Sequence, residues 1–73
     1  MVYAIRHTVT RGLFVRRIAN PEGGFRLVWA FLSSGRKFTP LLFSNLDEAM
    51  EEQEDLRSLG CTQTVIVHVT IGG

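Results

Sequence analysis

Cysteine is nearly missing from this sequence: Cys61 is the single one in 73 residues, which excludes an internal disulfide. The two histidines, His7 and His68, show no C-x-x-C or H-x-x-x-H spacing, so we predict neither a metal site nor a cofactor. A chain this short buries roughly 60% of the surface that its unfolded form exposes, which leaves it marginally stable alone. Without disulfide or metal, association is the remaining stabilising device, and we expect a homodimer.

Long apolar runs are also missing. The longest charge-free apolar stretches fall well short of the roughly 18 residues that a membrane-spanning helix needs, so we expect no membrane partner. The first residues, MVYAIRHTV, have neither the charged start nor the apolar centre of a signal peptide. A single free cysteine is typical of a reducing compartment. These features predict one cytoplasmic domain over residues 1–73.

Lysine is scarce, and the charges divide between the two halves of the chain. Residues 1–38 hold seven basic residues against one acidic residue, and residues 39–73 hold one basic residue against six acidic ones. Seven of the eight basic residues are arginine, which suits interfaces better than lysine does. The basic half could pair with the acidic half inside one monomer or between molecules, and the sequence leaves both open.

Hydrophobic periodicity gives the fold class. Alternation and β-branched content predict strands at residues 2–9, 13–19, 25–32, 38–43 and 62–71, and helical spacing predicts a helix from about residue 46 to residue 59. The helix start has two possible caps, Ser44 with Asp47 or Asn45 with Glu48. We therefore expect an α+β fold of order β-β-β-β-α-β. Its single, mostly antiparallel sheet has strand order 5-1-2-3-4, and the helix packs on one face.

The segment Asn20-Pro21-Glu22-Gly23 predicts a type I turn closed by a glycine bulge, with Asn20 opposite Gly24. This geometry sets a register between the two flanking strands. One face then carries the pairs Ala19–Phe25, Arg17–Leu27, Val15–Trp29 and Leu13–Phe31. The other face carries Ile18–Arg26, Arg16–Val28 and Phe14–Ala30.

One helix covers one face of such a sheet, so the other face lacks intramolecular cover. It is expected to carry apolar residues edged by Arg6 and other arginines. The candidate interface on it consists of Phe14, Arg16, Ile18, Arg26, Val28, Ala30 and Ile66. This composition resembles protein interfaces. We expect a small non-enzymatic interaction module that self-associates through this face, and by analogy an accessory or inhibitory protein of bacterial or phage type.

Catalytic motifs are absent from the sequence. No serine or cysteine stands beside a histidine in a recognisable motif, and there is no glycine-rich phosphate loop. His7 and His68 are expected on opposite faces of the sheet, and a solvated helix face accounts for the cluster of acids. We therefore expect that the protein is not an enzyme.

Nucleic-acid binding is the alternative function. Basic strands and turns could contact phosphates through Arg11, Arg16, Arg26, Arg36 and Lys37. The segment KFTPLLFSNLDEA is similar to the strand-to-helix junction of the arm-binding domains of phage-type integrases, over about a sixth of the chain. Those domains use a three-stranded sheet on DNA. This chain differs in its acidic helix and its additional strands, so the resemblance assigns no DNA-contacting residue.

Overall fold

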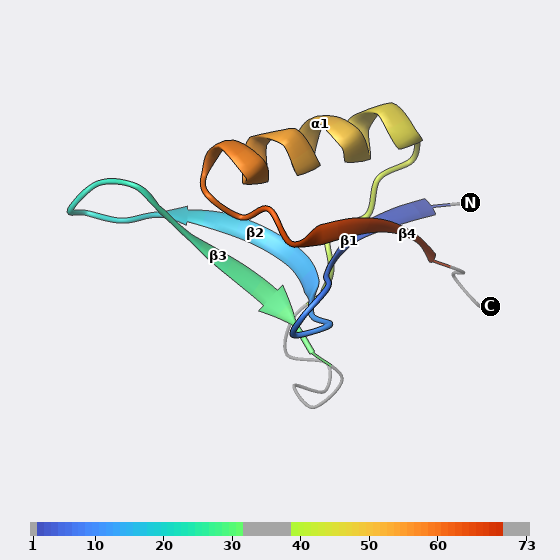
Figure 1. The fold of residues 1–73 in the computed structure, drawn as a ribbon, viewed down its shortest axis with the longest axis horizontal. Coiled ribbons are helices and arrows are strands. Elements are labelled where there is room, and N and C mark those ends of the chain that lie inside the picture. The colour runs from blue at the N-terminus through green and yellow to red at the C-terminus, as the bar shows by residue number, and fades with distance from the viewer. Residues whose placement is uncertain (1, 32–38, 70–73) are drawn as a thin grey trace.

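Four strands and one helix make up the computed structural model, which describes residues 2–31 and 39–69. The elements are β1 (Val2–His7), β2 (Leu13–Ala19), β3 (Phe25–Ala30), α1 (Leu46–Ser58) and β4 (Thr64–Val69). Every strand pair is antiparallel, in the order β3-β2-β1-β4. Helix α1 lies over one face of the sheet, and the β2–β3 hairpin extends away from it (Figure 1). The predicted α+β class is confirmed.

The helix begins and ends where local chemistry dictates. Asn45 has extended backbone angles, and its side-chain oxygen accepts a hydrogen bond from the Glu48 N–H at 2.8 Å. Of the two predicted caps, the structure therefore uses Asn45 rather than Ser44. At the other end Gly60 adopts a φ of +92° and donates its N–H to the Arg57 carbonyl at 3.0 Å. Glycine enters this left-handed region without steric cost, so the helix ends there.

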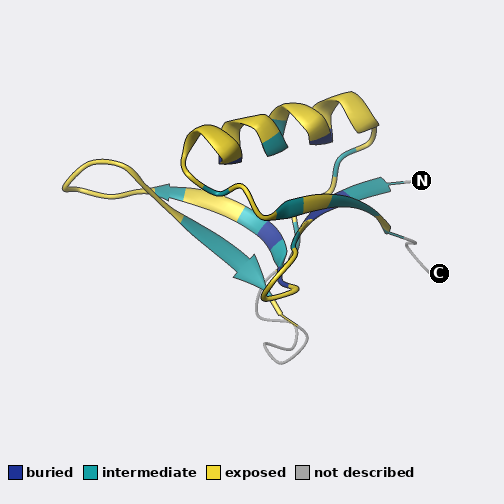
Figure 2. Cartoon of the chain, in the orientation of Figure 1, coloured by how far each residue is buried: buried dark blue, intermediate teal, exposed yellow. Residues whose placement is uncertain are grey.

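A small core joins α1 to the sheet. The large, fully buried side chains are Ile5, Phe14 and Leu56. Phe14 meets the Trp29 ring edge-on with 5.5 Å between ring centroids, and Phe43 packs against the same group. Figure 2 shows buried positions beneath α1 and exposed positions over the whole hairpin tip.

A β-bulge in β2 changes the predicted register. The turn forms as expected, and the Asn20 N–H donates a hydrogen bond to the Gly24 carbonyl at 3.0 Å. The predicted pairs nearest the turn are confirmed, and the register then shifts between Phe14 and Arg16. Beyond the shift the pairs are Phe14–Trp29 and Leu13–Ala30, in place of Val15–Trp29, Leu13–Phe31 and Phe14–Ala30. Because a bulge absorbs one extra residue, Phe14 turns to the helix side of the sheet. Its predicted place on the uncovered face is wrong.

The faces of β4 are also the reverse of the prediction. Ile66 lies opposite Ile5, and residues directly opposite share a face, so Ile66 packs under α1. His68 lies opposite Tyr3, with the two rings edge-on at 4.7 Å. His68 and His7 therefore lie on the same face of the sheet, at opposite ends of the β1–β4 pair, and not on opposite faces as predicted.

The predicted fourth strand lies elsewhere than expected. Phe43 exchanges backbone hydrogen bonds with Tyr3, both at 2.9 Å, as an isolated bridge, and the Leu41 N–H donates to the Phe14 carbonyl at 2.9 Å. Residues 39–43 thus lie between β1 and β2 where these strands diverge, rather than along the outer edge of β3. Pro40 has no N–H for a ladder, and the Phe43 ring contributes to the core. Residues 32–38 and 70–71 of the predicted strands and turn lie outside the described residues.

Candidate protein-interaction surface

The face of the sheet opposite α1 is termed the outer face. Its members follow from the strand registers, which pair Arg6 with Val65 and with Leu13, Arg16 with Val28, and Ile18 with Arg26. Together with their neighbours at alternate positions, the outer-face residues are Val2, Ala4, Arg6, Leu13, Arg16, Ile18, Arg26, Val28, Ala30, Val65, Val67 and Val69.

The outer face is aliphatic at its centre, and α1 lies on the other side of the sheet (Figure 1). Ala4 is fully buried, the other aliphatic side chains are half-buried, and Val65 is 37% exposed. The three arginines are exposed. Five of the seven candidate interface residues lie here, namely Arg16, Ile18, Arg26, Val28 and Ala30. The other two, Phe14 and Ile66, belong to the core.

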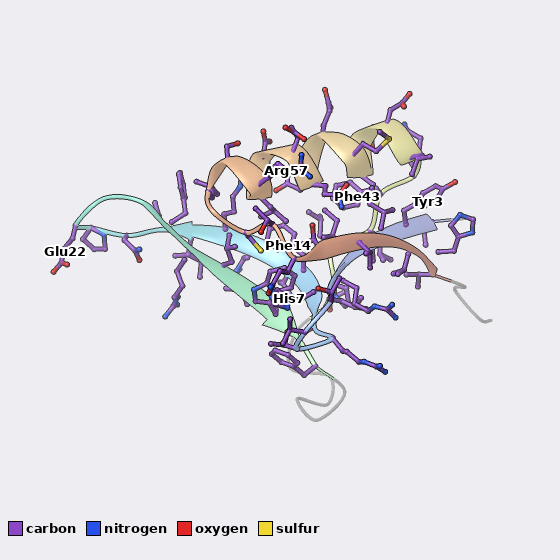
Figure 3. All side chains as sticks on the ribbon, in the orientation of Figure 1. Tyr3, His7, Phe14, Glu22, Phe43 and Arg57 are labelled. Atoms are coloured by element: carbon purple, nitrogen blue, oxygen red, sulfur yellow. The ribbon has the colours of Figure 1, made fainter. Side chains whose placement is uncertain are left out.

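The charge split is neutralised inside the molecule at one position of the described chain. The Arg17 Nε lies 3.5 Å from the Glu52 Oε1, which links β2 to α1, and the Arg17 guanidinium also lies 5.8 Å from the Phe25 ring centroid. Arg6, Arg16 and Arg26 have no acidic partner among the described residues. Glu22, the one acid of the basic half, lies at the hairpin tip (Figure 3). The outer face therefore keeps its positive charge.

The aromatic side chains of the core lie apart from these arginines. Phe14, Trp29 and Phe43 pack in or against the core, and Phe14 and Phe43 lie below α1 in Figure 3. Tyr3 shares the helix-side face with Ile5. The outer face, as defined above, has no aromatic ring. It thus combines arginine with aliphatic surface, and the exposed rings of Phe25 and Phe31 lie outside this set, at the two ends of β3.

The residues proposed for nucleic-acid contact are only partly brought together. Arg16 and Arg26 share the outer face on neighbouring strands. Arg11 is exposed in the turn after β1, with a φ of +64°. Arg36 and Lys37 lie outside the described residues.

An open pocket of about 530 Å³ lies where the chain returns from α1 to β4. It is lined by His7, Leu27, Leu59, Gly60, Cys61, Thr62 and Gln63. The His7 Nδ1 accepts hydrogen bonds from the backbone N–H groups of Val9 and Thr10, both at 3.2 Å, which places the neutral ring's hydrogen on Nε2. Burial raises the pKa of the Cys61 thiol, which lowers its thiolate content. Local hydrogen bonds thus account for the orientation of the His7 ring, and burial accounts for the raised pKa of the Cys61 thiol.

The described residues also bear on metal sites and membrane spans. No group of three histidine, cysteine or carboxylate side chains is placed to hold a metal ion within residues 2–31 and 39–69. Among the helices described, none has the length and apolar character needed to cross a membrane. Comparisons with protein-family models, with curated proteins and with solved structures give no match.

The sequence reasoning missed one exposed region along β4. Leu46 and Met50 of α1 fit the apolar spacing that predicts the helix, yet they are 45% and 52% exposed. Val65 of the adjacent strand is also exposed. The sequence contains a signal for this exposed region: from Cys61 to the end of β4 it has no Asp, Glu, Lys or Arg.

Proposed function

We propose that this chain is a non-enzymatic protein-interaction module whose outer face binds an acidic protein surface with an apolar centre. The observation that carries this proposal is the outer face itself, where aliphatic side chains stand among Arg6, Arg16 and Arg26 without an acid or an aromatic ring. Aliphatic contacts supply affinity in such an interface, and charge complementarity supplies orientation and association rate.

The same charges favour an acidic partner over a second copy on this face. A two-fold pairing of outer faces sets one positively charged patch against another. Like charges held together at an interface weaken binding and select against that partner. Self-association, expected from the small core, therefore fits better at a surface without this charge.

A pulldown with paired charge reversals tests the proposal. The immobilised chain is incubated with extract of its source cells, in parallel with the double variant Arg16→Glu/Arg26→Glu and with Arg11→Glu as a matched control in an exposed turn. We expect acidic proteins to be retained by the parent and the control, lost from the double variant, and released by salt. Retained proteins that are unchanged by the double reversal would contradict the proposal.

Nucleic-acid binding stays the second candidate, favoured by the same three arginines on one face. Fluorescence anisotropy with labelled single-stranded and duplex DNA, measured at several salt concentrations, tests it. Phosphate contacts by three arginines give a slope of log K against log salt of about −2 to −3. Absence of binding at low salt would remove this candidate.

A further inference from the structure

We propose that β4 pairs antiparallel with β4 of a second copy, forming a two-fold dimer with one continuous sheet. We use the term dimer edge for the free edge of β4 together with Leu46, Met50, Gln53 and Arg57 of α1. This edge is distinct from the outer face, so the dimer leaves the proposed partner surface open.

The hydrogen-bond pattern shows which backbone groups face the dimer edge. The Thr8 N–H donates to the Gln63 carbonyl at 2.9 Å, so residues 8 and 63 form a hydrogen-bonded pair. Antiparallel ladders alternate such pairs with non-hydrogen-bonded ones. The backbone N–H and C=O groups of Thr64, Ile66 and His68 therefore point away from β1. The Thr64 carbonyl accepts from the Gln53 Nε2 at 3.1 Å. The N–H and C=O groups of Ile66 and His68 have no partner in the described chain.

The side chains of β4 do not protect this edge. Natural edge strands are commonly blocked by lysine, proline, a bulge or an inward-pointing charge. β4 reads TVIVHV, pairs in register with β1 along its whole length, and has none of these features. Two copies can therefore meet along β4 without setting like charges opposite each other.

The flank of α1 above β4 is apolar in the same region. The Gln53–Thr64 hydrogen bond identifies the flank that faces β4. Helical spacing of three, four and seven residues from Gln53 places Met50, Arg57 and Leu46 on that flank. Two of these side chains are large, apolar and about half exposed. The flank thus contributes apolar contact area and one cation.

The acids of α1 divide between its two flanks. Glu52 reaches the flank opposite β4, where its carboxylate pairs with Arg17 of β2, and helical spacing places Glu48 and Asp55 there as well. Helical spacing from Met50 places Asp47 and Glu54 beside the apolar side chains of the dimer edge. With Arg57, these two acids give the helical part of the dimer edge both signs of charge.

The two helices lie on the same face of the continuous sheet in this dimer. The two-fold axis of an antiparallel β4–β4 pair is perpendicular to the sheet, so it keeps both copies of α1 on one side. α1 contacts both β1 and β4, and its flank with Leu46 and Met50 is turned toward the axis in each copy.

Charge complementarity accompanies this apolar contact. The two helices run antiparallel across the two-fold axis, which turns the last turn of each toward the first turn of the other. The last turn carries Arg57 and the first turn carries Asp47. The antiparallel arrangement thus directs the basic end of each helix toward the acidic end of the other.

Light scattering after size exclusion tests the dimer. At protein concentrations up to about 0.5 mM we expect twice the 8.2 kDa chain mass for the parent. Met50→Asp places a carboxylate on the apolar flank of each copy, and His68→Pro removes an outward N–H from the edge, so each should weaken dimerisation about tenfold or more. Leu59→Asp is the matched control, because Leu59 is 41% exposed on the opposite flank, and it should leave the dimer intact.

Hydrogen exchange distinguishes this edge from other dimers. The Ile66 and His68 amides should be protected in the parent and exchange at least about tenfold faster in Met50→Asp, with far-UV circular dichroism confirming that the variant is folded. A monomeric parent, or a dimer that both edge variants leave intact, would overturn the proposal. So would a dimer disrupted by Val28→Asp instead, since that outcome places the second copy on the outer face. Arg16→Glu/Arg26→Glu should abolish partner binding while leaving the dimer, so the two proposals can fail separately.

Discussion

Truncation of Phe14 to alanine is the most direct test of the β2 register. Its side chain is 1% exposed and packs with Ile5, Leu56 and the edge of Trp29. Phe-to-Ala changes at such sites cost about 3–5 kcal/mol, from lost burial and from the cavity left behind. A domain of 73 residues has about 4–11 kcal/mol of stability, and a small core favours the lower end. Phe14→Ala should therefore remove most of the free energy of unfolding.

Urea unfolding followed by tryptophan fluorescence measures this effect, because Trp29 is the one tryptophan and lies against Phe14. Phe25→Ala is the matched control: Phe25 lies on the same hairpin, is 51% exposed, and contacts the Arg17 guanidinium. Its loss should cost about 1 kcal/mol or less. All variants are compared at one protein concentration, since dimerisation makes stability concentration-dependent. Equal costs for the two phenylalanines would refute the bulge and return Phe14 to the outer face.

Two further predictions concern the ends of α1. Asn45→Ala should lower the free energy of unfolding by about 1 kcal/mol in thermal unfolding, because the Glu48 N–H loses its acceptor. The control Ser44→Ala should change it by less than about 0.5 kcal/mol. Equal effects of the two substitutions would mean that Asn45 is not the cap. Burial raises the pKa of the Cys61 thiol in the folded state, so on raising the pH the thiol of the unfolded chain ionises first. The preference of the folded state for the neutral thiol therefore contributes fully to stability at neutral pH. This contribution is lost as pH rises through the folded-state pKa. Stability of the parent should accordingly fall more than that of Cys61→Ala in alkaline urea titrations, and parallel pH profiles would contradict this.

Local chemistry predicted the features that depend on a few neighbouring residues. The turn at Asn20 and the alternation of the strands both depend on sequence-adjacent residues, and both are present in the structure. Arg16, Ile18 and Arg26 were placed on the correct face because they lie on the turn side of the bulge. Phe14 lies beyond the bulge, and its position follows from contacts with Ile5 and α1 that no local pattern encodes.

The faces of β4 needed long-range information. Val65, Val67 and Val69 alternate with Thr64, Ile66 and His68, so both faces carry β-branched apolar residues and periodicity favours neither strongly. Pairing with β1 and the hydrogen bond from Gln53 to Thr64 place Ile66 beneath α1. The position of residues 39–43 also needed long-range information. Their strand-like pattern does not show that β1 and β2 diverge and that Phe43 pairs with Tyr3 between them.

The divergence between β1 and β2 also separates the two outer-face arginines of the β2–β3 hairpin from the β4 edge. Residues 39–43 fill the space between these strands, and the β2–β3 hairpin with Arg16 and Arg26 extends from the body formed by β1, β4 and α1 (Figure 1). Because β3 and β4 are opposite edges of the sheet, a dimer through β4 puts the two hairpins at the far ends of one eight-stranded sheet. If both proposals hold, a partner with two acidic sites at matching separation would bind both ends. Such a partner gains avidity, because the second contact is intramolecular. Dissociation of the dimer by Met50→Asp should reduce that avidity while the affinity of each single outer face stays the same.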